Sequence, residues 1–318
     1  MPTTAPPATT TTTTTVVPTT APRPTLPPSP GPTGPLRVGV RSYNWVDWSR
    51  ATPANGRYRA RSGRRLVTTI WYPAIGAASA FAHWGAAADR GDGPFPVVLF
   101  AHGHEGEPAD YAAVVTSWVS RGYVVVAPEF PLSSRHALGG ASFADLLEQP
   151  GDLSFVLTRV LERNADPRSF LHGLIDARRI GAVGHSMGAW TVLGMVANAC
   201  CHDRRVTAAI ILAGELAPEF RTKFFTAGAP PILFVHSRDD DVVPYAAGAR
   251  AYAAAPRPKY LLRLTSGGHI VPYFGPKTAA GAAVLRVTNE FLDRYLRSIA
   301  AVAIVSPDPR IAQLDKRL

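Results

Sequence analysis

Cysteines, acidic residues and long apolar runs are scarce in this sequence. The only two cysteines, Cys200 and Cys201, are neighbours, so they cannot form the disulfide framework of a small secreted domain. Because adjacent cysteines rarely bond to each other, we expect two thiols. No apolar run approaches the ~20 residues that a membrane-spanning helix requires. With 46% hydrophobic residues, the 318-residue chain has instead enough apolar side chains for one large core.

Acidic residues are outnumbered by basic ones. The chain has 23 Asp and Glu against 33 Lys and Arg, which gives a formal net charge of +10. Such a charge can favour anionic polymers, membranes or nucleic acid. We find no nucleic-acid motif and no basic run with interleaved aromatic residues. The expectation is therefore a solvated, arginine-rich surface and no nucleic-acid partner.

Residues 2–35 consist almost wholly of Thr, Pro, Ala and Val. Such a segment cannot bury enough surface to fold, and its prolines favour extended conformations. Linkers of this composition commonly follow an export signal or a membrane anchor. No apolar signal-peptide core follows Met1. We therefore expect a secreted or cell-surface protein whose signal lies outside this sequence; a dispensable tail on an intracellular protein is the alternative.

The remainder of the chain alternates strand and helix patterns. Continuous apolar runs such as Pro96–Ala101 are typical of strands buried on both faces. This rhythm predicts a mostly parallel sheet with helices on both faces, one domain over 36–300 and a C-terminal tail over 301–318. Pro150-Gly151 should interrupt one helix, with Asp152 capping its second part. Strands are expected at 36–48, 65–72, 96–101, 123–127, 180–184, 206–212, 232–236 and 260–264, and helices at 109–120, 143–163, 186–199, 246–254 and 278–297.

The sharpest motif is Gly184-His185-Ser186-Met187-Gly188, which matches G-x-S-x-G between a predicted strand and a predicted helix. The motif requires a tight turn that exposes the serine oxygen at a helix N-terminus, where negative charge is favoured. Ser186 is therefore the candidate nucleophile. The Met187 N–H is placed to donate to an oxyanion.

A serine hydroxyl needs a base, and the base needs an orienting acid. Asp240 follows a predicted strand in an Asp-x-x-Val-Pro pattern, with Asp239 and Asp241 as competing candidates. His269 follows Gly267-Gly268 and is the candidate base. The chain order Ser, Asp, His is the one this motif requires.

The second oxyanion donor should come from the loop His102-Gly103-His104-Glu105-Gly106. We nominate the backbone N–H of His104, and expect a structural role for the His102 side chain. Two histidines and a glutamate on a loop are weak grounds for a metal. We expect no metal and no cofactor.

Residues 36–298 resemble the α/β-hydrolase superfamily. Ile70–Pro73, His102-Gly103, Gly122–Val125 and Asp176–Gly188 are similar to bacterial platelet-activating-factor acetylhydrolase-like and dienelactone-hydrolase-like esterases. Ile180–Gly188, Asp240–Pro244 and His269 are similar, more weakly, to actinobacterial cutinases and polyester hydrolases. The resemblance implies an α/β-hydrolase fold, a triad of Ser186, Asp240 and His269, and oxyanion N–H groups at His104 and Met187.

Departures from these families narrow the expected chemistry. Dienelactone hydrolases use cysteine where this chain has Ser186, which favours ordinary esters. Cutinases have further glycines after the G-x-S-x-G motif, where this chain has Ala189-Trp190. They have a tryptophan after the next strand, where this chain has Gly214-Glu215-Leu216. Their C-terminal disulfide cannot form here. Polyester cleavage is therefore possible but not indicated. As pocket-lining candidates we name Phe130, Trp190, Leu216 and Tyr273, with 131–143 as a partial lid or an ordinary connection.

The sequence thus predicts a monomeric carboxylic-ester hydrolase that acts on a small or polymeric ester through an acyl-enzyme. A polyester hydrolase or lipase, or a peptidase or amidase with the same triad, remains an alternative. A wall-associated binding module that kept the fold without catalysis is an alternative of another class.

Overall fold

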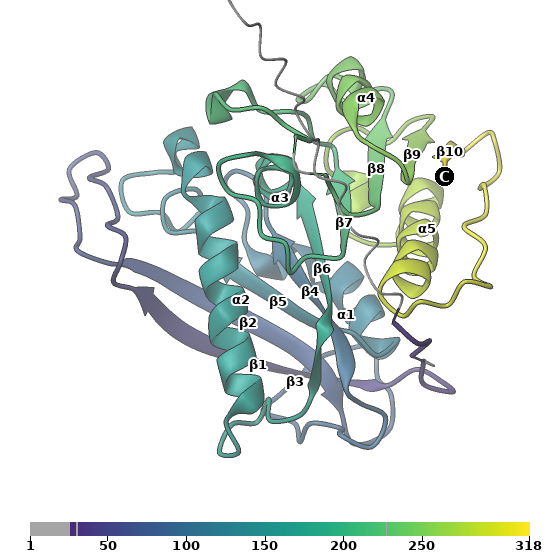
Figure 1. Ribbon diagram of the computed structural model, residues 1–318, viewed down its shortest axis with the longest axis horizontal. Helices are drawn as coiled ribbons and strands as arrows, with labels where there is room; N and C mark the ends of the chain where they lie inside the picture. Colours follow the sequence, from purple (N-terminus) through teal and green to yellow (C-terminus); the bar gives the residue numbers. More distant parts are fainter. Residues whose placement is uncertain (1–25, 30, 227) are drawn as a thin grey trace, which may run out of the picture.

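A computed structural model describes residues 26–29, 31–226 and 228–318 (Figure 1). The predicted linker over 1–35 lies largely outside these residues. Where the chain is described, residues 26–29 and 31–35 contain neither helix nor strand. They contact the folded body through hydrogen bonds from Arg179 to the Pro27 carbonyl and from the Ser29 N–H to the Arg297 carbonyl.

One mixed sheet forms the centre of the molecule, in the order β10-β9-β8-β7-β6-β4-β5-β2-β1-β3. Its middle strands, from β5 through β4 to β9, run parallel, whereas β2 joins β5 and β10 joins β9 in antiparallel pairs. The predicted mostly parallel sheet is confirmed. Its strands are β1 Arg37–Asp47, β2 Arg64–Ala74, β3 His83–Trp84, β4 Phe95–Ala101, β5 Val124–Glu129, β6 Ile175–His185, β7 Ala208–Leu212, β8 Ile232–Ser237, β9 Lys259–Leu264 and β10 Ala312–Arg317.

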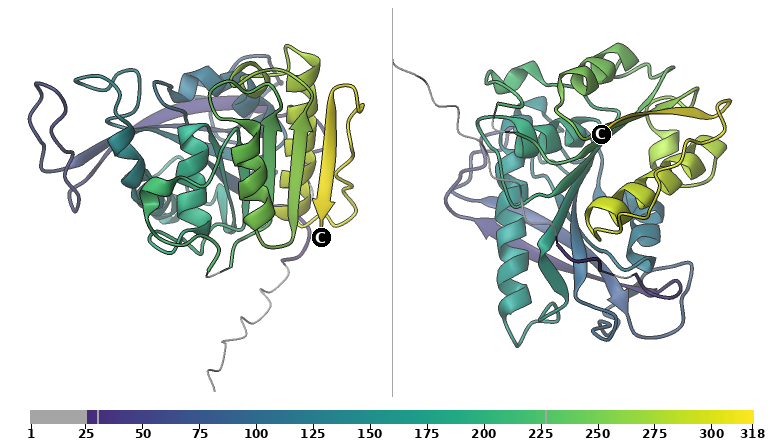
Figure 2. Two further views of the ribbon diagram at one scale, coloured as in Figure 1. Left: turned by 90° about the horizontal axis from the view of Figure 1, so that it is seen from above. Right: turned by 45° about the vertical axis from the view of Figure 1, so that its right-hand side comes forward.

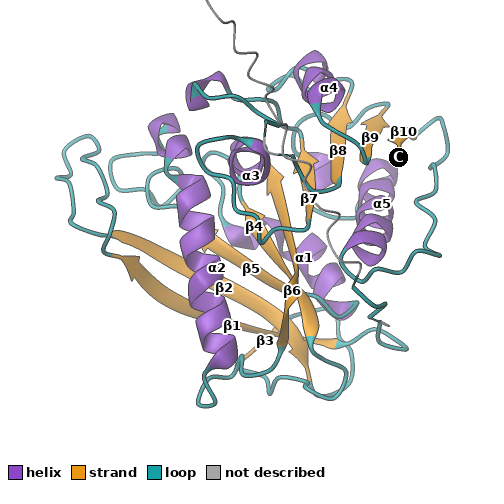
Figure 3. Cartoon of the chain, viewed as in Figure 1, coloured by secondary structure: helices purple, strands orange, loops and turns teal. Residues whose placement is uncertain are grey.

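Helices cover both faces of this sheet (Figure 3). One core layer contains side chains of α2, α3 and α4, and the other contains side chains of α1 and α5. The middle strands β4 and β7 are buried along their whole length, as their continuous apolar runs predicted. The helices are α1 Ala112–Ser120, α2 Gln149–Ala165, α3 Met187–Ala197, α4 Tyr245–Ala254 and α5 Ala279–Tyr295, with short 3-10 helices η1 Pro108–Tyr111, η2 Phe143–Leu147, η3 Pro218–Phe220 and η4 Val271–Tyr273.

Pro150 begins a helix rather than interrupting one. It lies in the first turn of α2, where its missing N–H costs no intrahelical hydrogen bond. The predicted helix over 143–163 therefore divides into η2 and α2. Asp152 is not the N-cap, which is Glu148; its buried carboxylate instead pairs with Arg64.

Two stretches expected to lack strands contain them. Between the expected strands 65–72 and 96–101, His83–Trp84 pairs with β1. Residues 301–318 do not form a separate tail, because Ala312–Arg317 pairs with β9 as the edge strand β10 (Figure 2). The alternation of apolar residues in Ala-Gln-Leu-Asp-Lys-Arg is too weak to have indicated a strand.

Cys200 and Cys201 are joined by a disulfide in the turn that follows α3. The expectation of two thiols is therefore wrong. The turn brings the two neighbouring side chains together at the surface, where Cys200 is exposed.

Candidate active site

Ser186 lies in the sharp turn between β6 and α3. Its backbone has φ 54° and ψ −124°, a conformation that residues with a β-carbon rarely adopt. Gly184 and Gly188 permit this turn, because a β-carbon at either position would overlap a neighbouring backbone carbonyl, that of Gly188 or Ala101 respectively. The motif therefore holds Ser186 at the N-cap of α3, as the sequence predicted.

The structure brings Ser186, His269 and Asp240 into one hydrogen-bonded chain. His269 Nε2 lies 2.8 Å from Ser186 Oγ, and His269 Nδ1 lies 2.9 Å from Asp240 Oδ2 and 3.0 Å from Oδ1. Because a carboxylate only accepts, the Nδ1–H donates to Asp240 and Nε2 accepts from the serine hydroxyl. The three residues follow β6, β8 and β9, whose carboxyl ends meet at one edge of the sheet.

The Asp240 carboxylate is buried yet held in its charged form. It accepts the N–H groups of Val242 at 3.0 Å and Val243 at 2.8 Å, in addition to His269. Burial raises the pKa of Asp240, but hydrogen bonds from His236, His269 and the Val243 N–H outweigh it and hold that pKa well below its ordinary value. The carboxylate is therefore available to stabilise a positive charge on His269.

Of the three consecutive aspartates, Asp240 is the one that contacts His269. Asp239 accepts the Ser237 hydroxyl at 2.5 Å and the N–H groups of Gly267 at 3.1 Å and Gly268 at 3.0 Å. It thereby fixes the glycine pair immediately before His269. Asp239 was named only as a competing candidate for the orienting acid, and this anchoring role was not predicted.

The loop between β4 and η1 passes directly beside the serine. A β-carbon on Gly103 would lie 3.2 Å from Ser186 Cβ, so glycine allows the close approach. Neither His104 nor Met187 donates its N–H to a backbone carbonyl of the described chain. Glu105 has φ 56°, and its N–H donates to the Ser133 carbonyl at 2.8 Å, which fixes the loop. Met187 directly follows Ser186 in the chain and His104 directly follows Gly103. The role of their N–H groups as oxyanion donors stays a prediction.

The His185 side chain links three parts of the site. Its Nε2 lies 2.8 Å from the His269 carbonyl oxygen, and its Nδ1 lies 2.8 Å from the Tyr111 hydroxyl. Tyr111 in turn accepts the Gly103 N–H at 3.2 Å. Burial, with the nearby His269, lowers the pKa of His185 to about 3, so this imidazole stays neutral.

His102 has the structural role that the sequence predicted. Its buried ring accepts the Phe130 N–H at Nε2, 3.0 Å away. This contact places the residue after β5 against the loop that carries His104.

Two of the four predicted lining residues do not line the site. Phe130 and Tyr273 are both fully buried, the first against His102 and the second against His185, so the prediction for them is wrong. Their aromatic side chains fill the core beneath the catalytic loops. Leu216 is half-buried and packs against the main core.

Trp190 and the unpredicted Phe143 form an aromatic wall. Phe143 stacks on the His104 ring at 4.0 Å between centroids, and Trp190 lies 6.3 Å from Phe143. Phe143 is 56% exposed, and Ile270 and Val271 beside His269 are about equally exposed. Exposed apolar side chains therefore lie against the His104 ring and, in the sequence, directly after His269.

The segment 131–143 is tied down rather than free to move. Ser133 accepts a hydrogen bond from Gln149 at 2.6 Å, and Gln149 also bonds Thr191 of α3. The Leu132 N–H donates to the buried Asp145. These contacts favour the ordinary connection over the lid.

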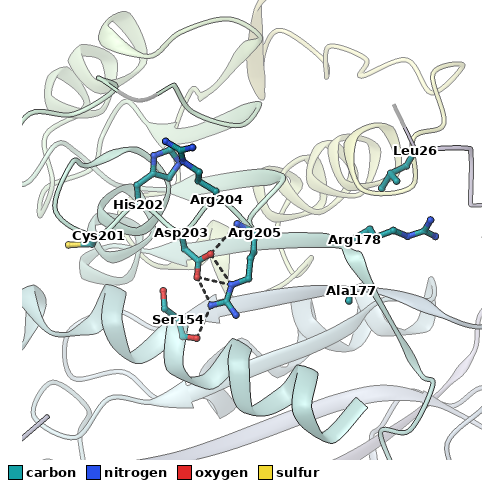
Figure 4. Close-up of a pocket in the computed structure, with 9 residues that line it drawn as sticks. All are labelled: Leu26, Ser154, Ala177, Arg178, Cys201, His202, Asp203, Arg204 and Arg205. Atoms are coloured by element: carbon teal, nitrogen blue, oxygen red, sulfur yellow. Dashed lines mark hydrogen bonds and ion pairs between the residues drawn. The ribbon is translucent and has the colours of Figure 1, made fainter. Parts of the chain in front are cut away.

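Figure 4 shows the residues that line a cavity of about 860 Å³, and Ser186 is not among them. The cavity is bordered by Arg178 near the start of β6 and by residues 201–205 before β7, at the amino ends of these strands. At ~3.3 Å per residue, eight residues of β6 separate Arg178 from Ser186 by roughly 25 Å. Arg178 and Arg205, which Figure 4 shows, already pair with Asp176 and Asp203.

Among the described residues, no group of three or more His, Cys, Asp or Glu side chains is arranged to hold a metal ion. No helix within these residues has the length and hydropathy needed to cross a membrane.

Comparisons with known proteins agree with this architecture. The sequence model of the chlorophyllase family matches residues 86–212. A search of curated proteins gave no match. The structure is similar to ferulic acid esterase from Streptomyces cinnamoneus, with a TM-score of 0.64 and 23% identity over 88% of this chain and 97% of that one. The chain therefore has an α/β-hydrolase fold, like that esterase, and its residues 86–212 match the chlorophyllase family model.

Proposed function

We propose that the protein is a carboxylic-ester hydrolase that works through an acyl-enzyme on Ser186. The observation that carries this proposal is the 2.8 Å separation of Ser186 Oγ and His269 Nε2. The other ring nitrogen of His269 is hydrogen-bonded to the buried Asp240 carboxylate. This is the arrangement of a nucleophile, a general base and an orienting acid.

In the first half-reaction, His269 Nε2 takes the Ser186 proton as Oγ attacks the ester carbonyl carbon. The new imidazolium is stabilised by Asp240, which remains ionised. Collapse of the tetrahedral intermediate breaks the bond to the leaving alkoxide, which receives the proton from His269. In the second half, His269 deprotonates a water that attacks the acyl-enzyme. Ser186 then regains its proton as the carboxylic acid leaves.

The developing oxyanion needs donors that are already in place. The N–H of Met187, at the first position of α3, also has the favourable field of the helix N-terminus. The N–H of His104 comes from the loop beside Ser186. Removing one such donor typically costs on the order of 10²–10³ in turnover.

The surroundings of Ser186 favour an ester with an apolar group. Phe143, Trp190, Ile270 and Val271 are at least partly exposed and flank the hydrogen-bonded chain. Burying an apolar group against them gains roughly 25 cal/mol per Å². The names of both similar proteins, chlorophyllase and ferulic acid esterase, fit ester hydrolysis.

The experiment compares Ser186→Ala with Ser62→Ala on p-nitrophenyl esters from acetyl to long acyl chains. Ser62 is exposed and belongs to the loop between β1 and β2, so its replacement controls for a serine outside the site. We expect Ser186→Ala to lose hydrolysis and labelling by a fluorophosphonate, and Ser62→Ala to keep both. Undiminished hydrolysis in Ser186→Ala, or a labelled peptide that lacks Ser186, would refute the proposal.

A further inference from the structure

A second cavity lies beside the candidate active site. It has a volume of about 370 Å³, within the range of small-molecule pockets. The loop between β1 and β2 forms one wall and residues 131–138 form the other; in Figure 2 the β1–β2 loop projects from the body next to this segment. The lining includes Tyr58, Arg59, Arg61, Arg65, Glu129 and Leu132.

The β1–β2 loop carries a basic run that the sequence analysis missed. Residues 57–65 contain five arginines, with Tyr58 between the first two. The expectation that no basic run with an interleaved aromatic residue exists is therefore wrong. The run escaped notice because glycine and small residues separate its arginines, whereas the structure gathers three of them around one cavity.

The cavity has an excess of positive charge. Arg59, Arg61 and Arg65 form no ion pair with any described carboxylate, and Arg65 donates instead to the Asn44 amide oxygen at 2.8 Å. Glu129 is the one carboxylate among the described lining residues. It already accepts hydrogen bonds from Ser134 and His136, each at 2.9 Å. Three guanidinium groups therefore face one engaged carboxylate.

The walls of the cavity are fixed in advance. The Asn55 amide donates to the carbonyls of Leu138 at 2.9 Å and Gly140 at 2.7 Å, which joins the two walls. Within the β1–β2 loop, the Thr52 hydroxyl donates to the Gly63 carbonyl at 2.8 Å. A ligand would therefore bind with little ordering cost from the backbone.

The cavity is separate from Ser186 but adjoins its surroundings. Leu132 and Ser134 belong to the lining, and Ser133 between them accepts the N–H of Glu105 from the loop that carries His104. One segment of chain thus forms both the cavity wall and the support of that loop.

We propose that this cavity binds an organic monocarboxylate with a small apolar body. A guanidinium group matches a carboxylate through two parallel hydrogen bonds, and three such groups are present. Tyr58, Leu132 and Leu138 offer apolar surface for the body of the ligand. With three guanidinium groups against the one Glu129 carboxylate, the lining favours an anion over a neutral ligand. This site does not depend on the proposed ester hydrolysis.

Isothermal titration of 2-naphthoate into the full-length Ser186→Ala protein tests the proposal. The serine variant removes any turnover, so only binding is measured. We expect saturable binding that weakens at least tenfold in the double variant Arg59→Gln/Arg61→Gln. The matched control Arg204→Gln/Arg221→Gln removes two exposed arginines without ion pairs from elsewhere in the described chain, and should bind as tightly as the parent.

The neutral analogue 2-naphthamide separates charge recognition from apolar binding. We expect it to bind at least tenfold more weakly than 2-naphthoate. Absence of 2-naphthoate binding at millimolar concentration, equal affinity in the Arg59/Arg61 variant, or equal affinity for the amide would overturn the proposal. Unfolding temperatures check that each variant is folded. Hydrolysis by the wild-type enzyme is assayed separately, so failure of either proposal leaves the other standing.

Discussion

His185 Nε2 donates to the backbone carbonyl of His269 across 2.8 Å, so the residue before Ser186 holds the loop that carries His269. The direction of each hydrogen bond follows from the partners. A carbonyl only accepts, which places the imidazole proton on Nε2 and leaves Nδ1 to accept from Tyr111. Tyr111 accepts the Gly103 N–H. A buried series of hydrogen bonds therefore connects the loop at Gly103, through His185, to the loop at His269.

Replacing His185 with Phe should reduce kcat about tenfold while changing KM less. The substitution fills a similar volume but removes the donor to the His269 carbonyl, and one such hydrogen bond is worth roughly 1–1.5 kcal/mol. Steady-state kinetics on a short ester measure the effect. His185→Gln keeps an N–H donor and should recover part of the loss. If Phe and Gln reduce kcat equally, the contact does not position His269.

Stability should fall as the pH is lowered from about 6.5 toward 3. In the folded protein the pKa of His185 is lowered to about 3. The unfolded chain therefore binds a proton near pH 6.5 that the folded protein does not bind. Full uptake of one proton corresponds to a slope of about 1.4 kcal/mol per pH unit. Denaturant unfolding at several pH values measures this slope.

A comparison with His185→Phe isolates the contribution of this residue. The buried His102 also has a lowered pKa, caused by burial, and contributes in the same direction. The variant should therefore keep part of the pH dependence and lose the part that belongs to His185. Parallel curves for the two proteins would show that His185 is not the group responsible.

The hydrogen-bonded arrangement of Ser186, His269 and Asp240 was predictable from the sequence because each of them lies in the connection after an apolar strand. Parallel strands bring their carboxyl ends to one edge, so a serine, an aspartate and a histidine in that order can meet. Asp239 could not be told from Asp240 by pattern alone. What separates them is the direction of each side chain, and that depends on the turn after β8.

The surroundings of the triad were less predictable. Phe130 and Tyr273 follow strand ends just as the triad residues do, yet they turn inward and are buried. The hydrogen bond between Tyr111 and His185 joins residues far apart in the chain, so no local sequence pattern could predict it. The edge strand β10 escaped notice because its exposed face is charged, as is common for an edge.

The three consecutive aspartates should have unequal effects on catalysis. Asp240→Asn removes the charge that orients His269 and is expected to cost on the order of 10⁴ in kcat. Asp239→Asn weakens the anchor of Gly267 and Gly268 and should cost about tenfold. Asp241 is exposed, and Asp241→Asn should be neutral. Steady-state kinetics at one pH rank the three, and any other order contradicts the assignment.

Gly188→Ala should prevent formation of the nucleophile turn. The added β-carbon would overlap the carbonyls of Ala101 and His102, and these belong to the backbone, which cannot rotate away. We expect a loss of several kcal/mol in the free energy of unfolding, as is typical of overpacked cores. Gly34→Ala is the control, since nothing lies within 4 Å of its β-carbon position. Thermal unfolding distinguishes them, and equal stability would mean that the turn tolerates a side chain.

Arg64, Asp145 and Asp152 form a buried ion-pair cluster that should contribute to stability. Arg64 is fully buried and pairs with Asp145 at 2.8 Å and with Asp152 at 2.5 Å, joining β2 to η2 and α2. Arg64→Met would leave two buried carboxylates without this partner and should cost about 3–5 kcal/mol. Arg159→Met breaks an exposed pair with Glu162 and should cost less than about 1 kcal/mol. Denaturant unfolding compares them, and a loss in Arg64→Met no larger than in Arg159→Met would show that the cluster does not hold η2 against the sheet.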